Sequence, residues 1–151
     1  MRALIMIWAF VGAAFFTGLA AAHPDGSVGK AVIVNPTENK WQHDPGDPPG
    51  SQSIVLREDA KTSEIELLAR YPPGHVFPPH WHSANERIVL LEGRMSITNG
   101  NTVEYLDSGG FAYLPAKELQ RMACVSQTEC RFYVYWDGKL DFHKETESPN
   151  L

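Results

Sequence analysis

The stretch "GHVFPPHWHSANERIVLLEG", Gly74 to Gly93, places two histidines and a glutamate close together, just before an apolar run. On a β-strand, side chains two positions apart point to the same face, so His80 and His82 are expected to direct their imidazoles toward one point. Glu86 follows after a short polar link, close enough for its carboxylate to reach the same point. Two neutral imidazoles and one carboxylate form the ligand set that non-haem Fe(II) oxygenases use, and Zn, Mn, Ni or Cu can also be held by it.

The residues that flank this cluster favour a rigid site. Pro-Pro pairs at 72–73 and 78–79 restrict the backbone before the histidines, and the glycines at both ends permit sharp turns. An H-x-H pair by itself is usually no more than a solvated pair on an exposed strand. The prediction of a metal site therefore rests on the whole pattern rather than on the two histidines.

The rest of the chain is a series of short segments rich in Val, Ile, Tyr and Phe, separated by Gly, Pro, Asn and Asp. The turn "NGN" at 99–101 favours a tight hairpin, because Asn and Gly tolerate positive φ angles. We expect a first strand in "KAVIV" at 30–34, and then a Pro/Asp/Gly-rich loop at 35–51 that is either functional or disordered. Many short strands at this spacing predict an all-β sandwich or barrel.

The N-terminus has the layout of a secretory signal peptide: Arg2, an apolar stretch at 3–16, and then small residues that end at Ala22. A membrane anchor is the alternative, but the apolar stretch is short for a span of about 20 residues. We therefore expect cleavage after Ala22, export to the periplasm or the medium, and no stable membrane anchor afterwards. The predicted divisions of the chain are a signal peptide at 1–22, a strand and loop at 23–51, a β-barrel domain at 52–143 and a tail at 144–151.

The distribution of charged residues indicates which class of partner the chain binds. The chain has a net charge of −5, with Lys and Arg scattered among more numerous acids and no basic run. This pattern argues against a nucleic-acid partner and against attraction to anionic lipid. A small molecule or a metal ion is the expected partner.

The two cysteines, Cys124 and Cys130, bracket a polar turn between two strand-like segments. Disulfides persist outside the cytosol, so the expected export favours a disulfide between them. Metal ligation is the alternative, but two cysteines far from the histidines in sequence are a weak metal signal. A disulfide here closes a small loop and would stabilise the fold only modestly.

The histidine stretch reads G-x5-H-x-H-x3-E-x6-G, which resembles the first motif of the cupin family at every fixed position. The resemblance covers roughly residues 52–136. It implies a single small cupin barrel, a double-stranded β-helix or jelly-roll, whose mouth holds the metal. Because dimers through barrel edges are common in cupins, it also implies a homodimer.

The second cupin motif, G-x5-P-x-G-x2-H-x3-N, is only partly present. Gly109 and Pro115 are in register, but Lys117, Gln120 and Cys124 replace the glycine, the histidine and the asparagine. The resemblance thus implies Gln120 at the position of the fourth protein ligand. Its amide oxygen could coordinate the metal, or its side chain could hydrogen-bond a metal-bound water or substrate. The third interpretation is that the barrel has lost its metal and binds a ligand without chemistry.

Other side chains are candidates for the pocket. Met122 shares the parity of Gln120, and Tyr113 and Arg94 complete the candidate set. In "RFYVYW" at 131–136 one alternating face belongs to the core, but parity alone does not identify which. His75 has the opposite parity from His80 and is interpreted as a loop or rim histidine.

Two functional hypotheses follow. In the first, the protein is an exported metal-dependent enzyme of the oxygenase or isomerase type, which acts on a small oxygenated organic molecule. Its cofactor would be one divalent transition metal ion, with Fe, Mn or Zn favoured and Ni or Cu as the alternatives. In the second, the protein is a non-catalytic module that senses or scavenges a metal or small ligand. The sequence does not separate them, because no general base outside the ligand set stands out.

Overall fold

The computed structural model describes residues 30–36 and 41–146. The expected signal peptide with its cleavage site at Ala22, and residues 147–151 of the expected tail, lie outside the described residues. All strands belong to one compact unit that begins at Val32. In the described ranges the chain forms no helix with the length and apolarity that a membrane crossing requires.

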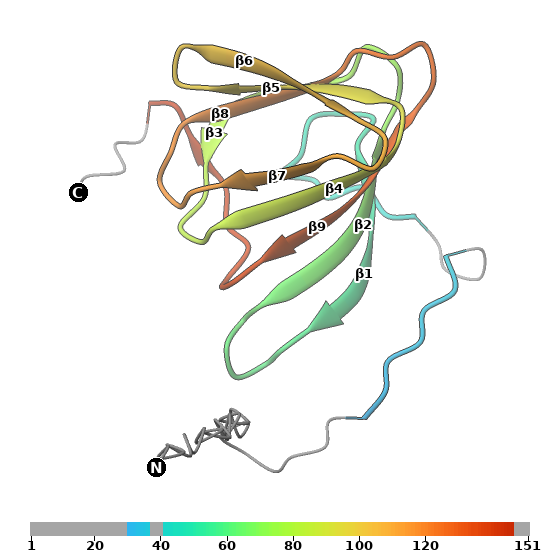
Figure 1. Cartoon of the computed structure of the whole chain (residues 1–151). Helices are drawn as coiled ribbons and strands as arrows, with labels where there is room; N and C mark the ends of the chain where they lie inside the picture. Colours follow the sequence, from blue (N-terminus) through green and yellow to red (C-terminus); the bar gives the residue numbers. More distant parts are fainter. Residues whose placement is uncertain (1–29, 37–40, 147–151) are drawn as a thin grey trace, which may run out of the picture. The chain divides into compact units, whose positions relative to one another are not determined.

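Ten strands in the described part of the chain form two antiparallel five-stranded sheets (Figure 1). The first sheet has the order β1 (Gln52–Glu58), β2 (Ile65–Tyr71), β9 (Cys130–Trp136), β4 (Glu86–Glu92) and β7 (Phe111–Leu114). The second has the order β10 (His143–Lys144), β3 (Val76–Trp81), β8 (Gln120–Cys124), β5 (Arg94–Asn99) and β6 (Thr102–Asp107). The predicted all-β, jelly-roll type of fold is confirmed.

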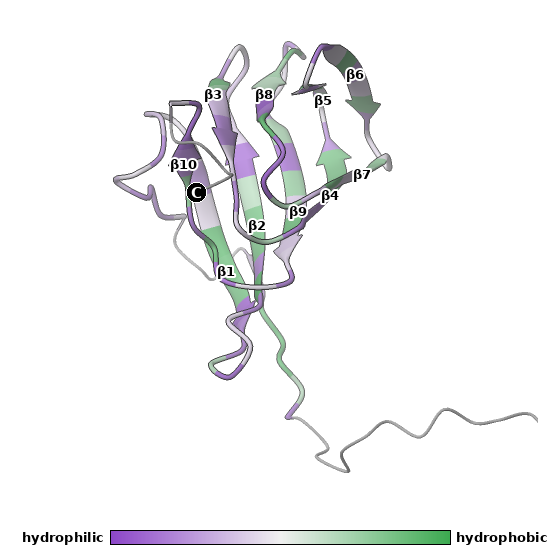
Figure 2. Ribbon diagram, turned by 90° about the vertical axis from the view of Figure 1, so that its left-hand side faces the viewer, coloured by the Kyte–Doolittle hydropathy of each residue, from purple (hydrophilic) through white to green (hydrophobic). Residues whose placement is uncertain are grey.

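Strand β9 shows how side-chain alternation builds the core between the sheets. Phe132, Val134 and Trp136 are buried, whereas Tyr133 and Tyr135 on the opposite face are half-buried. Figure 2 shows the same mixture of hydrophobic and hydrophilic residues along the strands. The tertiary structure thereby identifies the inward face, which parity alone left open.

Glycine permits two of the connections that shape the barrel. Gly100 adopts a φ of 56° in the two-residue turn between Asn99 and Thr102, so the predicted hairpin is confirmed. Gly93 has a φ of 85°, and a Cβ there would lie only 2.7 Å from the carbonyl oxygen of Glu129. A residue with a side chain therefore does not fit where the chain passes from β4 in one sheet to β5 in the other.

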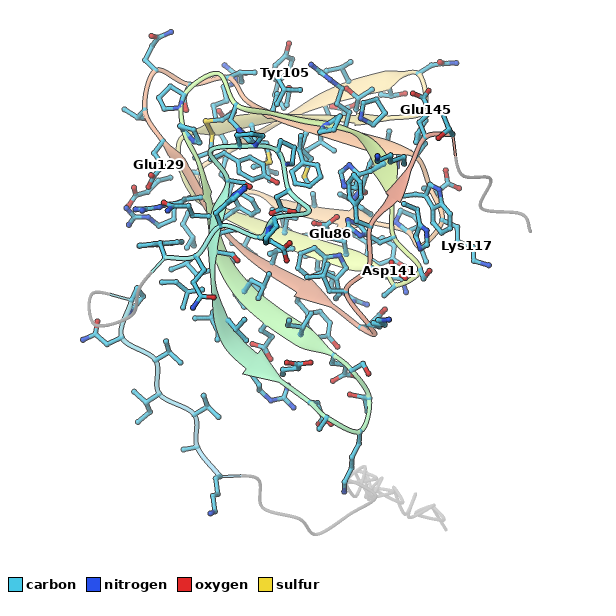
Figure 3. The ribbon with its side chains drawn as sticks, turned by 180° about the vertical axis from the view of Figure 1, so that it is seen from behind. Glu86, Tyr105, Lys117, Glu129, Asp141 and Glu145 are labelled. Carbon is cyan, nitrogen blue, oxygen red and sulfur yellow. A yellow bond between two sulfur atoms is a disulfide. The ribbon has the colours of Figure 1, made fainter. Side chains whose placement is uncertain are left out.

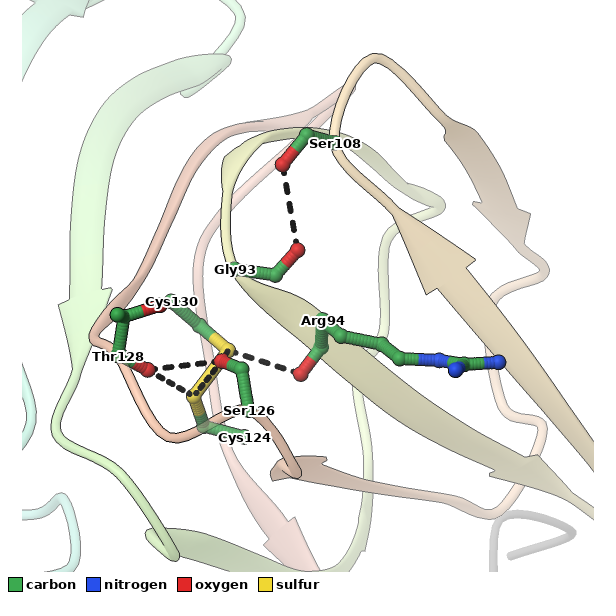
Figure 4. The surroundings of a disulfide bond; sticks show 7 residues. All are labelled: Gly93, Arg94, Ser108, Cys124, Ser126, Thr128 and Cys130. Atoms are coloured by element: carbon green, nitrogen blue, oxygen red, sulfur yellow. Dashed lines mark hydrogen bonds between the residues drawn. A yellow bond between two sulfur atoms is a disulfide. The ribbon is translucent and has the colours of Figure 1, made fainter.

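The predicted disulfide between Cys124 and Cys130 is present, and Figure 4 shows its surroundings. Cys124 ends β8 in the second sheet and Cys130 begins β9 in the first. Both residues are almost fully buried. The bond therefore ties the two sheets together at the end of the barrel where the chain passes from one to the other.

The N-terminal strand predicted at 30–34 is wrong. These residues have no partner strand in the described part of the chain, and Ile33 is 93% exposed. High β-propensity does not form a strand without a neighbour that accepts its backbone hydrogen bonds. The first pairing instead involves Gln42 and Ser53, which form an isolated bridge. At the other end, β10 crosses the boundary that was predicted at residue 143.

Candidate metal centre

The four predicted metal ligands come together between the two sheets. In the antiparallel pairing of β3 with β8, His80 lies directly opposite Gln120. Glu86 begins β4 in the other sheet, and His82 lies in the link between β3 and β4. All four side chains are buried, with His80 and Glu86 each only 1% exposed. Figure 3 shows Glu86 in the interior, whereas Tyr105 and Lys117 are at the periphery.

Backbone carbonyls fix the tautomer of both histidines. His80 Nδ1 lies 2.7 Å from the carbonyl oxygen of Pro78, and His82 Nδ1 contacts the carbonyl oxygen of Asp141. A carbonyl oxygen only accepts hydrogen bonds, so each Nδ1 must carry the proton and donate it. Each neutral imidazole therefore has its lone pair on Nε2, which is the arrangement found in metal-binding histidines.

The free Nε2 atoms face the carboxylate of Glu86 and the amide of Gln120. His82 Nε2 lies 3.7 Å from Glu86 Oε2. Gln120 Nε2 donates to the same oxygen at 2.5 Å and lies 3.4 Å from His80 Nε2. The amide group of Gln120 thus lies between His80 and Glu86. In the described ranges, no three His, Cys, Asp or Glu side chains are close enough together to coordinate a metal ion without rearrangement.

Burial dominates the electrostatics of the cluster. It raises the pKa of Glu86 from 4.5 to about 7, with the Gln120 hydrogen bond opposing the shift. Burial, together with the neighbouring His82, lowers the pKa of His80 from 6.5 to about 4, and burial also lowers the pKa of His82. No Lys or Arg of the described residues forms an ion pair with Glu86. By donor type, two imidazoles and a carboxylate without a cation, the cluster suits a divalent cation, which would supply the missing positive charge once the side chains close on it.

Asn85 holds the start of β4 in place, a role that the sequence did not suggest. Its backbone N–H and its side-chain amide donate to the carboxylate of Asp137 at 3.0 and 2.9 Å. Its side-chain oxygen accepts from the backbone N–H of Ala116 at 3.0 Å. These bonds join three distant segments beside Glu86. No local sequence signal could have identified them, because the partners lie more than thirty residues apart.

A C-terminal segment, residues 140–144, lies against both histidines. The backbone carbonyl of Asp141 orients His82, and its carboxylate accepts from the backbone N–H of Ser83 at 2.8 Å. The ring of Phe142 stacks on His80 with the centroids 5.2 Å apart. No pattern in the sequence predicts a function for this segment, because its place depends wholly on tertiary contacts.

Lys117, which replaces the glycine of the second cupin motif, keeps a backbone conformation that suits glycine. Its φ is 64°, which costs a residue with a side chain about 1 kcal/mol. Its N–H donates to the carbonyl oxygen of His82 at 2.8 Å. The strained residue thus helps to hold the backbone of a predicted metal ligand.

A cavity of about 220 Å³ opens above His80, His82 and Glu86. Its wall includes Met122, as predicted. It also includes Asp44, Gly46, Asp47 and Ser51, so the Pro/Asp/Gly-rich loop covers the cavity. Residues 41–51 of this loop thus form part of the cavity wall, and a function for the loop stays a prediction.

Two pocket predictions were wrong. Tyr113 is 48% exposed on the outside of β7, where its hydroxyl donates to Asn85. Arg94 is exposed and forms an ion pair with Asp107 at 3.3 Å. Both errors arise because residue spacing on a short strand does not reveal which face is inside. His75 lies in the loop between β2 and β3, as one of the two alternatives predicted, but it is only 8% exposed and packs against Tyr71.

One curated relative and several solved structures are similar to this chain. The DNA damage-repair/toleration protein DRT102 of Arabidopsis thaliana is 32% identical over 95 residues, which are 62% of this chain and 29% of that protein. The chain thus spans less than a third of the length of this relative.

Among solved structures, a putative acetylacetone dioxygenase of Methylibium petroleiphilum aligns with a TM-score of 0.66 and 20% identity, covering 81% of this chain and 87% of that one. The polyketide cyclase RemF of Streptomyces resistomycificus aligns with a TM-score of 0.64 and 20% identity, covering 79% and 88%. An acetylacetone dioxygenase of Acinetobacter johnsonii aligns with a TM-score of 0.64 and 17% identity, covering 80% of this chain and 82% of that one. At this identity the likeness concerns the fold.

The family comparison covers most of the chain. The model described as the ChrR cupin-like domain matches residues 29–137, which include both sheets up to the end of β9 and all four predicted metal ligands. The antiparallel barrel and the first-motif residues described above agree with this match. The chain therefore belongs to the family of ChrR cupin-like domains, within the cupin superfamily.

Proposed function

We propose that the barrel binds one divalent transition metal ion through His80, His82 and Glu86, and that it acts on a small oxygenated organic molecule. Fe, Mn or Zn is the favoured ion, with Ni or Cu as alternatives. The observation that carries the proposal is the orientation of both histidines. Each donates Nδ1–H to a backbone carbonyl and directs Nε2 into the buried cluster. His82 Nε2 faces the carboxylate of Glu86, which lacks a cationic partner, and His80 Nε2 faces the amide of Gln120.

The proposed reaction chemistry follows from an incomplete ligand set. A metal ion held by three or four protein groups keeps open positions at which dioxygen is activated or a carbonyl group is polarised. The chain itself supplies a largely apolar chamber over that position, which limits the access of water. Since two of the similar folds are named acetylacetone dioxygenases, dioxygen-dependent turnover of a small oxygenated compound is the first activity to test.

Gln120 is proposed as the fourth group at the metal. Its amide nitrogen now donates to Glu86, and a rotation of the amide would present the oxygen atom to the ion instead. An amide oxygen is a weaker ligand than imidazole. A substrate would therefore displace it from the metal ion more easily than it would displace a histidine. The position opposite His80 supports this role.

Purified full-length protein is expected to carry about one transition metal ion per chain. Elemental analysis of protein that was never exposed to chelators measures this directly. With the ion bound, oxygen consumption in the presence of small ketones, phenols or sugars should exceed that of the metal-free protein. A barrel that remains metal-free after loading with each of the five ions would contradict the proposal, and binding without turnover would indicate a non-catalytic module.

Substitution of Gln120 should change metal affinity in opposite directions. Gln120→His restores an imidazole and is expected to tighten binding, whereas Gln120→Ala is expected to weaken it by about tenfold. Competition with a chelator of known affinity gives both values. The exposed Gln127, in the turn beside the disulfide, provides a matched control as Gln127→Ala. Unchanged affinity in both Gln120 variants would place the side chain away from the ion.

We also propose that the protein is exported. The N-terminal sequence supports this, and so does the disulfide between Cys124 and Cys130, because such bonds persist mainly outside the cytosol.

A further inference from the structure

The charged groups around the cavity are all of one sign. Four carboxyl groups line it, those of Asp44, Asp47, Glu86 and Asp141, and none of the described residues in its wall is Lys or Arg. An anionic ligand would therefore meet several carboxylates and no compensating side-chain cation. The wall disfavours carboxylate, phosphate and sulfate compounds.

Most of the remaining wall is apolar and comes from both sheets, with Leu67, Phe77, Met122, Phe132, Val134 and Phe142 among the contributors. The cavity volume of about 220 Å³ is below the range of roughly 300 to 1,000 Å³ that is common for drug-sized ligands. The occupant must therefore be small and must bury apolar surface.

Two hydrogen-bond donors on this wall lack an acceptor. Tyr71 is 5% exposed, its ring packs edge-on against Phe132 at 4.9 Å, and no hydrogen bond of the described residues involves its hydroxyl. The indole N–H of Trp136 is also buried without an acceptor in the described part of the chain. Burial and the nearby charges of Glu86 and Asp47 hold the pKa of Tyr71 well above 10, so its hydroxyl keeps the proton. The Tyr71 hydroxyl is not among the fully buried polar atoms, so a ligand oxygen in the cavity could reach it and accept its hydrogen bond.

We propose that the cavity binds a small, uncharged and mainly apolar carbonyl compound, and that the Tyr71 hydroxyl donates a hydrogen bond to its oxygen. The inference rests on the proposed function, because it names the class of molecule that would meet the metal centre. It depends on side chains other than the metal ligands, so it can be tested on metal-free protein.

Three probes of similar size separate charge from hydrogen bonding: acetophenone, benzoate and α-methylstyrene. The first has an uncharged carbonyl group, the second carries a negative charge, and the third has a methylene group in place of the carbonyl oxygen. Calorimetric titration of metal-free, full-length protein measures their affinities. We expect acetophenone to bind at least about tenfold more tightly than benzoate.

The variant Tyr71→Phe should weaken the binding of acetophenone by about three- to tenfold and leave that of α-methylstyrene unchanged. Tyr133→Phe is the matched control, because Tyr133 faces outward on the neighbouring strand and donates to Glu66 at 3.0 Å. It should change neither affinity. The thermal unfolding midpoint of each variant shows whether the barrel is intact.

Three results would overturn the inference: benzoate binding as tightly as acetophenone, no binding of acetophenone up to its solubility limit, or equal acetophenone affinity for wild type and a folded Tyr71→Phe. Metal titration of the same samples keeps the two proposals apart. Selective acetophenone binding by a barrel that takes up no metal would refute the proposed metal centre alone. Normal metal uptake with no selectivity among the probes would refute this inference alone.

Discussion

The substitution His82→Ala is expected to remove the metal ion from the barrel. It deletes a nitrogen whose lone pair faces Glu86 at 3.7 Å and whose tautomer is fixed by the carbonyl of Asp141. Loss of a partner that only supports a metal ligand already costs about 10- to 100-fold in affinity, so loss of the ligand itself should cost more than about 100-fold. Elemental analysis should find less than about a tenth of an ion per chain under conditions that saturate the wild type.

A matched histidine controls for the loss of a ring. His43 lies exposed in the loop over the cavity, and its Nδ1 contacts the carbonyl oxygen of Ser51 at 3.0 Å. His43→Ala should keep the full metal content. Thermal unfolding of metal-free samples shows whether His82→Ala still folds. A folded His82→Ala barrel that retains the ion would place the metal elsewhere.

The substitution Glu86→Gln should stabilise the metal-free barrel at neutral pH while it abolishes metal binding. The carboxylate is 1% exposed and has no cationic partner, so its ionised form is unfavourable in the fold. Gln has almost the same shape and still accepts the hydrogen bond from Gln120. The negative charge of Glu86 is therefore needed to bind the metal ion, but it destabilises the barrel when the ion is absent.

The pH dependence gives this prediction a sign and a range. Burial raises the pKa of Glu86 from 4.5 to about 7, so between these values the folded chain keeps a proton that the unfolded chain has released. The free energy of unfolding of the wild type must then fall as pH rises through this range, relative to Glu86→Gln. This difference in pKa between the unfolded and folded states corresponds to a loss of about 3 kcal/mol in the free energy of unfolding, and the full loss is present above pH 7.

The histidines act in the opposite direction, which is why the comparison with the variant is needed. Burial lowers the pKa values of His80 and His82, so their contribution to stability is lost as pH falls through that lower range. Both proteins contain these histidines, so their contribution largely cancels in the difference. Urea unfolding of metal-free samples across this pH range measures it. A wild type at least as stable as Glu86→Gln above pH 7 would contradict the prediction.

Much of the candidate site could be predicted from the spacing of residues that are close in sequence. His80, His82 and Glu86 lie within seven residues, and over so short a distance the two-residue period of a strand limits where their side chains can point. The turn at Gly100 and the disulfide were predictable for the same reason, since the residues that form them are close in sequence. The position of Gln120 opposite His80 needed the family resemblance, because forty residues separate them.

The sequence alone determined that this chain forms an all-β barrel with a histidine and glutamate cluster at one place along it. Which faces enclose the cavity depends on the folded arrangement, which places Tyr71 and Trp136 inside, and Tyr113 and Arg94 outside. It also brought Asp141 onto His82 and the loop that carries Asp47 over the opening. The physical reason is that alternation along a strand defines two faces, while packing between distant segments selects the one that is buried.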